Sequence, residues 1–217
     1  MKIFIYLKNL FISLFYQDIQ IPFWNHNSYY YRWIKEQLKE KINILDVGCG
    51  DGSLINYLNN SNRNLTGIDI SKKCINKANN YNKKNDNIKF ICTSFEDFDS
   101  KKLLYDGIIF CATLHHMDME KALIKSKNLL EKNGIIVIVG LSKPSSLIDW
   151  IIECLRIIPW FIFSKIHKMK SSEDLDIPTS YNIPKILEIK EVLNKVTSGF
   201  YLSYGLYYRY LVKWINK

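Results

Sequence analysis

"NILDVGCGDGSL", Asn43–Leu54, is a short apolar run that ends in Asp46 and leads directly into Gly48, Gly50 and Gly52. The chain has only nine glycines in 217 residues, and three of them fall within these five positions. An apolar run followed by a glycine-rich turn predicts a buried strand that leads into a helix. Glycine permits positive φ and removes the Cβ that would block a ligand. The turn therefore either serves the fold alone or brings the backbone close to a ligand.

From this stretch onward, strand and helix patterns alternate, which is typical of an α/β fold with a mostly parallel sheet. The predicted strands are 42–47, 64–70, 88–94, 105–113 and 133–141. The predicted helices are 53–58, 71–81 with Ser71 as its N-cap, 120–131 and 184–196. The aromatic, partly alternating tail, residues 198–217, predicts a closing pair of antiparallel strands.

We predict one domain in four parts, since 217 residues are too few for two well-buried domains. The parts are an N-terminal helical lid (1–41), a ligand-binding core (42–141), a helical cap inserted after the fifth strand (142–184) and a closing helix with strands (185–217). The apolar segments 1–16 and 146–163 are interrupted by polar residues or proline, so we expect neither a signal peptide nor a membrane span. Both suit amphipathic helices over a core, a pocket or a membrane interface, which leaves peripheral membrane contact open.

The composition indicates the cellular compartment of the protein and limits the classes of binding partner. The five cysteines are odd in number and form no CxxC pair, which favours a reducing, cytoplasmic setting and no metal site. The net charge of +9 would suit nucleic acid or an anionic membrane. However, the lysines follow predicted helix faces without an arginine-plus-aromatic motif, so we favour a solvated surface and expect no nucleic-acid partner. The oligomeric state stays open.

The acids around the glycines indicate the ligand. Asp46 precedes the turn, and Asp69 ends the second strand nineteen residues beyond Gly50. Asp46 and Asp51 place two carboxylates beside the glycines, and these would repel the pyrophosphate of a dinucleotide, which G-x-G-x-x-G turns bind. They suit a ligand with an ammonium group and sugar hydroxyls, because a carboxylate at the end of the second strand can bind a ribose diol.

With these motifs the chain resembles the class I S-adenosylmethionine (AdoMet) dependent methyltransferases, in their bacterial small-molecule branch. "LDVGCGDG" matches their first motif, "GIDIS" the acidic end of their second strand, and "DGIIFCATLHHM" with "ALIKSKNLLEKNGIIVIV" the fourth and fifth strands. The resemblance covers residues 43–141. It implies a Rossmann-like methyltransferase fold: a seven-stranded, mostly parallel sheet with a final antiparallel strand.

The resemblance also implies AdoMet as cofactor, S-adenosylhomocysteine (SAH) as product, and roles for named residues. Asp46 would hold the amino group, Asp69 the ribose hydroxyls, and Ile70 would pack on the adenine. Ser94 stands where relatives often carry an adenine-binding Asp, and His26 and Tyr29 could fold over the cofactor or simply pack a helix. The expected cofactor-binding residues are Asp46, Gly48, Cys49, Gly50, Asp69, Ile70, Ser94, Phe95, Cys111, His26 and Tyr29.

His115 and His116 follow the fourth strand and are the candidate catalytic residues. Either histidine could remove a proton from a hydroxyl acceptor at neutral pH, or "LHH" could be a structural helix start. The apolar cap, with Trp150, Trp160 and Phe161, favours a small, apolar acceptor, or is additional core. The sequence carries neither an acid-Pro-Pro-aromatic run nor a Pro-Cys nucleophile after the fourth strand.

We therefore predict direct in-line methyl transfer to an O, N or C atom of a small metabolite. The alternatives are an RNA methyltransferase and a non-catalytic AdoMet-binding regulatory protein.

Overall fold

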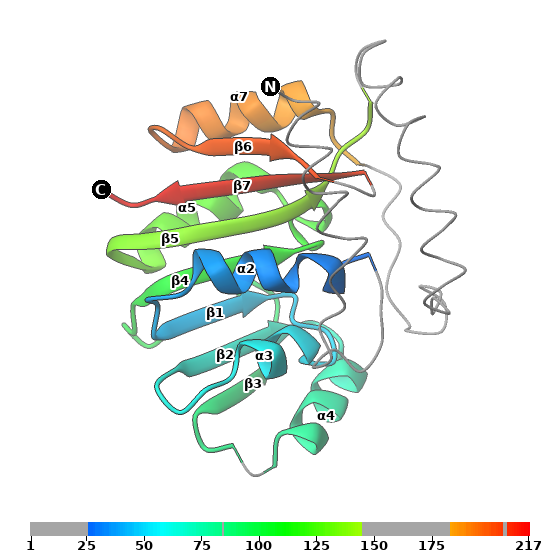
Figure 1. The fold of residues 1–217 in the computed structure, drawn as a ribbon, viewed down its shortest axis with the longest axis vertical. Coiled ribbons are helices and arrows are strands. Elements are labelled where there is room, and N and C mark those ends of the chain that lie inside the picture. The colour runs from blue at the N-terminus through cyan, green and yellow to red at the C-terminus, as the bar shows by residue number, and fades with distance from the viewer. Residues whose placement is uncertain (1–25, 84, 145–182, 206–207) are drawn as a thin grey trace.

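The computed structural model describes residues 26–83, 85–144, 183–205 and 208–217 (Figure 1). Its elements run in the order η1 (Ser28–Tyr30), α2 (Tyr31–Gln37), β1 (Asn43–Val47), α3 (Ser53–Leu58), β2 (Asn64–Asp69), α4 (Lys72–Tyr81), β3 (Ile88–Cys92), β4 (Tyr105–Cys111), η2 (Leu114–His116), α5 (Met119–Leu129), β5 (Leu130–Leu141), α7 (Ile186–Val196), β6 (Tyr201–Tyr204) and β7 (Arg209–Ile215). Residues 1–25 of the predicted lid and nearly all of the predicted cap lie outside the described residues.

The strands form one seven-stranded sheet in the order β3-β2-β1-β4-β5-β7-β6. The strands β1 to β5 pair in parallel, and β7 runs antiparallel between β5 and β6. The chain moves outward in one direction from β1 and in the other from β4, so the topological switch point lies between these two strands. The predicted fold class is confirmed, including the final antiparallel strand.

Helices cover both faces of the sheet, which explains why β4 and β5 read as nearly continuous apolar runs. On one face the core includes side chains of α5 and α7, such as Leu123 and Ile189. On the other it includes side chains of α2, α3 and α4, such as Ile34, Ile55 and Ile75. Figure 1 shows α2 and α3 in front of the sheet and α5 behind it.

Several predicted boundaries differ from the observed ones. The second, third and fourth strands end earlier, at Asp69, Cys92 and Cys111, where the chain turns away at the carboxyl edge. Ala112, with φ 60°, marks one of these turns. Strand β5 begins at Leu130 rather than Asn133, so it includes the last two residues of the helix predicted over 120–131. Within the described ranges, no helix has the length and apolar character needed to cross a bilayer.

Candidate active site

The glycine turn lies at the carboxyl edge of the sheet and is fixed there by hydrogen bonds from its backbone. The amides of Gly48 and Cys49 both donate to the Ile68 carbonyl at the end of β2, at 2.8 and 3.0 Å. Gly48 has φ 74°, and a Cβ there would overlap the Thr113 side chain, whose hydroxyl donates to Val47 O at 2.7 Å. The turn is therefore packed between β2 and the end of β4.

Asp69 supports the same turn through its carboxylate. Its Oδ2 accepts from the Gly50 amide at 2.9 Å, and its Oδ1 accepts from the Ser71 amide at 2.8 Å. Each carboxylate oxygen can accept a second hydrogen bond, so a ligand's hydroxyl groups can still bind there.

Asp46 lies next to it and is almost fully buried, with 2% of its surface exposed. Its Oδ1 has no hydrogen-bond partner among the residues that the structure describes. Burial, with a smaller contribution from the nearby Asp69, raises the pKa of Asp46 to about 7. A buried carboxylate without a partner is costly, so this position fits a ligand with a positive charge.

A cavity of about 1230 Å³ opens over this edge and brings together most of the predicted site residues. Those that line it are Asp46, Gly48, Cys49, Gly50, Asp69, Ile70, Ser94, Phe95, Cys111 and His116. His26, Tyr29 and His115 are not among its lining residues. From the N-terminal segment, Asn27 and Tyr31 line it instead, while the Tyr29 ring packs edge-on against Tyr30 at 4.9 Å.

The residues expected at the adenine differ in their surroundings. Ile70 is 71% exposed and presents an apolar surface beside the cavity. Phe95 is buried and packs edge-on against Phe110, with ring centroids 5.6 Å apart, so it also belongs to the core. The Ser94 hydroxyl donates to Asp97 Oδ2 at 2.7 Å and accepts from the Asp97 amide at 3.0 Å. Its hydrogen-bonding capacity is therefore largely used within its own turn.

Neither of the two predicted site cysteines, Cys49 and Cys111, is a nucleophile at neutral pH. Burial, and secondly Asp46, raises the pKa of Cys111 to about 12, an effect that Arg209 partly offsets. Burial likewise raises the pKa of the Cys49 thiol far above its usual range. Both therefore remain neutral thiols and contribute by packing.

The two histidines of η2 have different environments although their ring centroids are only 4.1 Å apart. His116 is exposed and lines the cavity, and partial burial lowers its pKa. Burial first, then His116 and Arg209, lower the pKa of His115 to about 4, and its Nδ1 has no hydrogen-bond partner among the described residues. Both rings are neutral at pH 7, but only His116 faces the cavity.

Several lining residues were not predicted from the sequence, among them Asn27, Tyr31, Lys77, Lys121 and Lys125. The lysine pattern predicts only solvated helix faces. Lys121 and Lys125 are four residues apart on α5, a spacing that places both on one helix face. That spacing was the available signal, whereas nothing local distinguishes Asn27. No group of three or more histidine, cysteine or acidic side chains in the described ranges is arranged to hold a metal ion.

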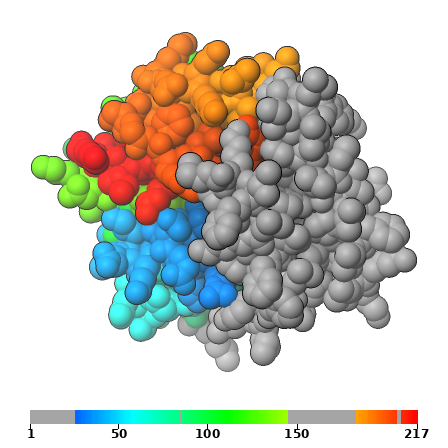
Figure 2. All heavy atoms as spheres, turned by 45° about the horizontal axis from the view of Figure 1, so that its top comes forward, coloured from blue at the N-terminus to red at the C-terminus, as the bar shows by residue number. Residues whose placement is uncertain are grey.

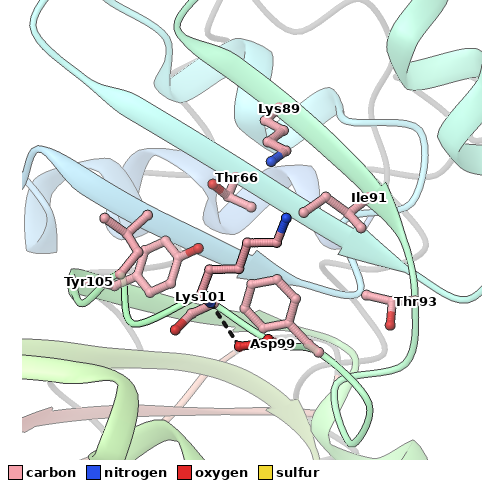
Figure 3. Close-up of a pocket in the computed structure, with 10 residues that line it drawn as sticks. Thr66, Lys89, Ile91, Thr93, Asp99, Lys101 and Tyr105 are labelled. Atoms are coloured by element: carbon pink, nitrogen blue, oxygen red, sulfur yellow. Dashed lines mark hydrogen bonds between the residues drawn. The ribbon is translucent and has the colours of Figure 1, made fainter.

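Figure 3 shows a smaller cavity of about 280 Å³ beside β2, β3 and the connection that leads to β4. Its lining includes Thr66, Lys89 and Lys101, and the Lys101 amide donates to Asp99 Oδ1 at 2.8 Å. None of the predicted site residues lines it, so the larger cavity is the candidate active site.

Comparison with known proteins gives the family. The family model described as "Methyltransferase domain" matches residues 38–195. The ubiquinone biosynthesis O-methyltransferases of Rickettsia typhi and Pelagibacter ubique are 32% and 31% identical to this chain. The alignments cover 81% and 75% of this chain, respectively, and 75% of each relative.

Among solved structures, the N-methyltransferase NodS of Bradyrhizobium japonicum WM9 in complex with SAH has a TM-score of 0.61 at 15% identity, over 96% of this chain and 97% of that one. The plantazolicin methyltransferase BpumL, solved in complex with a monoazolic desmethylPZN analog and SAH, has a TM-score of 0.61 at 19% identity, over 86% and 82% of the two chains. The chain therefore belongs to the methyltransferase-domain family, and its predicted resemblance to the class I AdoMet-dependent methyltransferases is confirmed.

Proposed function

We propose that this protein transfers a methyl group from AdoMet to a hydroxyl oxygen of a small, apolar metabolite. The observation that carries the proposal is the single large cavity shared by Asp46, the glycine turn, Asp69 and His116. The choice of oxygen is supported by the relatives above, whose names describe O-methyltransferases.

The lining residues fit AdoMet. Asp46 Oδ1 is a buried acceptor that has no partner within the described part of the chain, which suits the ammonium of the methionine part. Asp69 can accept from the ribose hydroxyls, and Ile70 offers an apolar surface for the adenine. When bound, AdoMet supplies a methyl group activated by a sulfonium.

His116 would act as the general base. Because partial burial lowers its pKa, the ring is unprotonated at neutral pH and can accept the acceptor's hydroxyl proton. Buried walls such as Phe95 and Tyr31 limit water near the reacting oxygen and orient an apolar acceptor.

A transfer assay tests the proposal directly. The full chain is incubated with methyl-labelled AdoMet and a panel of phenols, catechols and amines, and products are identified by mass spectrometry. We expect methylation of a hydroxyl acceptor, and a loss of about 10²–10⁴ in kcat for His116→Asn with SAH affinity unchanged. His115→Asn, a neighbouring ring outside the cavity lining, serves as the matched control and should lose much less.

Other outcomes would replace the proposal. Methylation of amines alone would make it an N-methyltransferase, and methylation of RNA alone would give it a nucleic-acid substrate. SAH binding without turnover on the panel or on a metabolite extract would indicate the non-catalytic regulatory role.

A further inference from the structure

Arg209, the first residue of β7, is a buried cation with little compensation. Only 7% of its surface is exposed. Its Nη2 donates to Asn27 Oδ1 at 2.6 Å, while Nε and Nη1 are buried and have no partner among the described residues. No carboxylate in the described part of the chain pairs with it. Such a charge is costly unless something else compensates it.

Arg63 shows what a buried arginine with a purely structural role looks like in the same protein. Its guanidinium donates to the carbonyls of Leu38, Leu58 and Lys41, at 2.6, 2.9 and 3.2 Å. These bonds join the ends of α2 and α3 to the segment that enters β1. Arg209 makes one such bond, so bracing the fold does not account for its guanidinium.

Strand alternation places Arg209 on the same face of the sheet as the cofactor-binding acid. Ile44, Ile109 and Leu211 share one core layer, so Asp46, Cys111 and Arg209, each two residues along its strand, point to that face. Asn27, the partner of Arg209, and Cys111 both line the large cavity. Arg209 is not itself among the lining residues, so its guanidinium lies behind this part of the wall, one hydrogen bond away from a residue that lines the cavity.

The distance across the sheet separates Arg209 from the cofactor's amino-acid end. Strands β4 and β5 lie between β1 and β7, which puts the two backbones about 14 Å apart. The ammonium and carboxylate of an α-amino acid are attached to the same carbon atom. A methionine group held at Asp46 would thus keep its carboxylate close to β1. Arg209 would then be available to bind the methyl acceptor.

We propose that Arg209 binds a carboxylate on the methyl acceptor, so that the acceptor is an apolar hydroxy acid rather than a neutral molecule. This inference rests on the proposed function. A guanidinium binds a carboxylate through two parallel N–H···O bonds from one edge, either Nε with Nη2 or Nη1 with Nη2. Nη2 has a second hydrogen besides the one donated to Asn27, and with Nε or Nη1, which have no partner among the described residues, it can supply such an edge. The hydrogen bond that Arg209 Nη2 donates to Asn27 Oδ1 fixes the orientation of the guanidinium.

The signal of the Arg209 Nε–H group in full-length protein labelled with [15N]arginine tests the site. Benzoate and benzamide, which differ only in charge and hydrogen-bonding, are titrated with and without saturating SAH, and Arg209→Lys assigns the signal. We expect benzoate to shift the signal and benzamide to leave it in place. Equal shifts, or none with benzoate, would overturn the proposal. A full shift on SAH alone, to which benzoate adds nothing, would give Arg209 to the cofactor instead.

Thermal unfolding separates ligand binding from a structural role. Arg209→Met removes an uncompensated buried charge, so we expect an unchanged or higher Tm. Arg63→Met, the matched control, should lower Tm because three carbonyls lose their donor. A fall in Arg209→Met as large as in Arg63→Met would show that Arg209 merely anchors the N-terminal segment. Failure of the proposed function would appear separately, as absence of SAH binding by the wild type.

Discussion

At the scale of single residues, Asp46 links the cofactor site to pH. Its pKa of about 7 in the folded protein means that it is protonated below neutrality, and an ammonium group favours the ionised form. We therefore expect SAH affinity to weaken about tenfold per pH unit below pH 7 and to level off above it. In Asp46→Asn the pH dependence should vanish, and affinity at pH 8 should fall about 10- to 100-fold. Calorimetry between pH 5.5 and 8.5 measures both effects.

The stability of the same variant provides the control. The folded pKa lies above the unfolded value of 3.8, so this group stabilises the fold fully below pH 4, and the contribution is lost as pH rises toward 7. Asp46→Asn should therefore have a higher Tm than the wild type at pH 8. A lower Tm there would mean that the carboxylate is compensated in the folded protein and that the pH argument is wrong.

Asp69 should be needed for SAH binding, because its carboxylate accepts hydrogen bonds from two backbone amides of the site. Asp69→Ala removes the acceptor for the Gly50 and Ser71 amides and the expected ribose contact. We expect SAH affinity to fall by about 100-fold or more, since hydrogen bonds to a charged group contribute about 1.5–3 kcal/mol each. Asp86→Ala, an exposed acid in the turn before β3, is the matched control and should bind SAH like the wild type. Equal SAH affinity in both variants would show that Asp69 does not contribute to cofactor binding.

Local patterns explain which of these residues could be predicted. Asp46, Gly48 and Asp69 stand at strand ends, where alternation and glycine spacing carry the information. Asn27 and Arg209 could not be found in this way, because they meet 182 residues apart in the chain. Whether the predicted residues bind AdoMet stays a prediction until the variants are measured.

At the scale of elements, the entry into α3 depends on Gly52. Its φ is 78°, and an added Cβ would lie 2.7 Å from Phe90 Cζ and 3.1 Å from Ala78 Cβ. Gly52→Ala should destabilise the protein by about 2–4 kcal/mol, from backbone strain together with overpacking between α3, β3 and α4. Gly50→Ala, with φ 55° and open space around its Cβ, should cost only about 1–2 kcal/mol. Urea unfolding compares the two, and equal costs would show that packing at Gly52 adds nothing.

The elements themselves were largely predictable, and their ends were not. Helix α3 has the predicted bounds, and Ser71 accepts from the Cys74 amide as the predicted N-cap of α4. The ends of β2, β3 and β4 depend on where neighbouring strands stop pairing, which involves residues far away in the sequence. The early start of β5 depends likewise on pairing with β4, where Tyr105 lies opposite Leu130.

At the scale of the whole molecule, buried contacts across the sheet contribute more to the free energy of unfolding than ion pairs on the surface. The ion pairs Lys121–Asp118 and Lys195–Glu120 are largely exposed and contribute little to stability. Trp214 on β7 is instead 3% exposed, and its Nε1 donates to Ser198 O at 3.2 Å. Trp214→Ala should therefore cost about 3–5 kcal/mol in unfolding free energy. Lys213→Ala, the next residue on the same strand, should cost less than about 0.5 kcal/mol, and a similar loss in both would contradict this view.

The place of β7 in the sheet has a consequence for the order in which the chain can fold during synthesis. This strand is translated after all the others, yet it lies between β5 and β6 and is the only strand that pairs with β6 among the described residues. The parallel strands β1 to β5 can assemble while translation continues, since their neighbours have already emerged. Until β7 is in place, the edge of β5 has unpaired backbone groups with which another strand could pair, and β6 has no partner strand among the described residues. Arg209 can bond to Asn27, which lines the cavity, only once β7 has been made, so this contact at the cavity wall forms last.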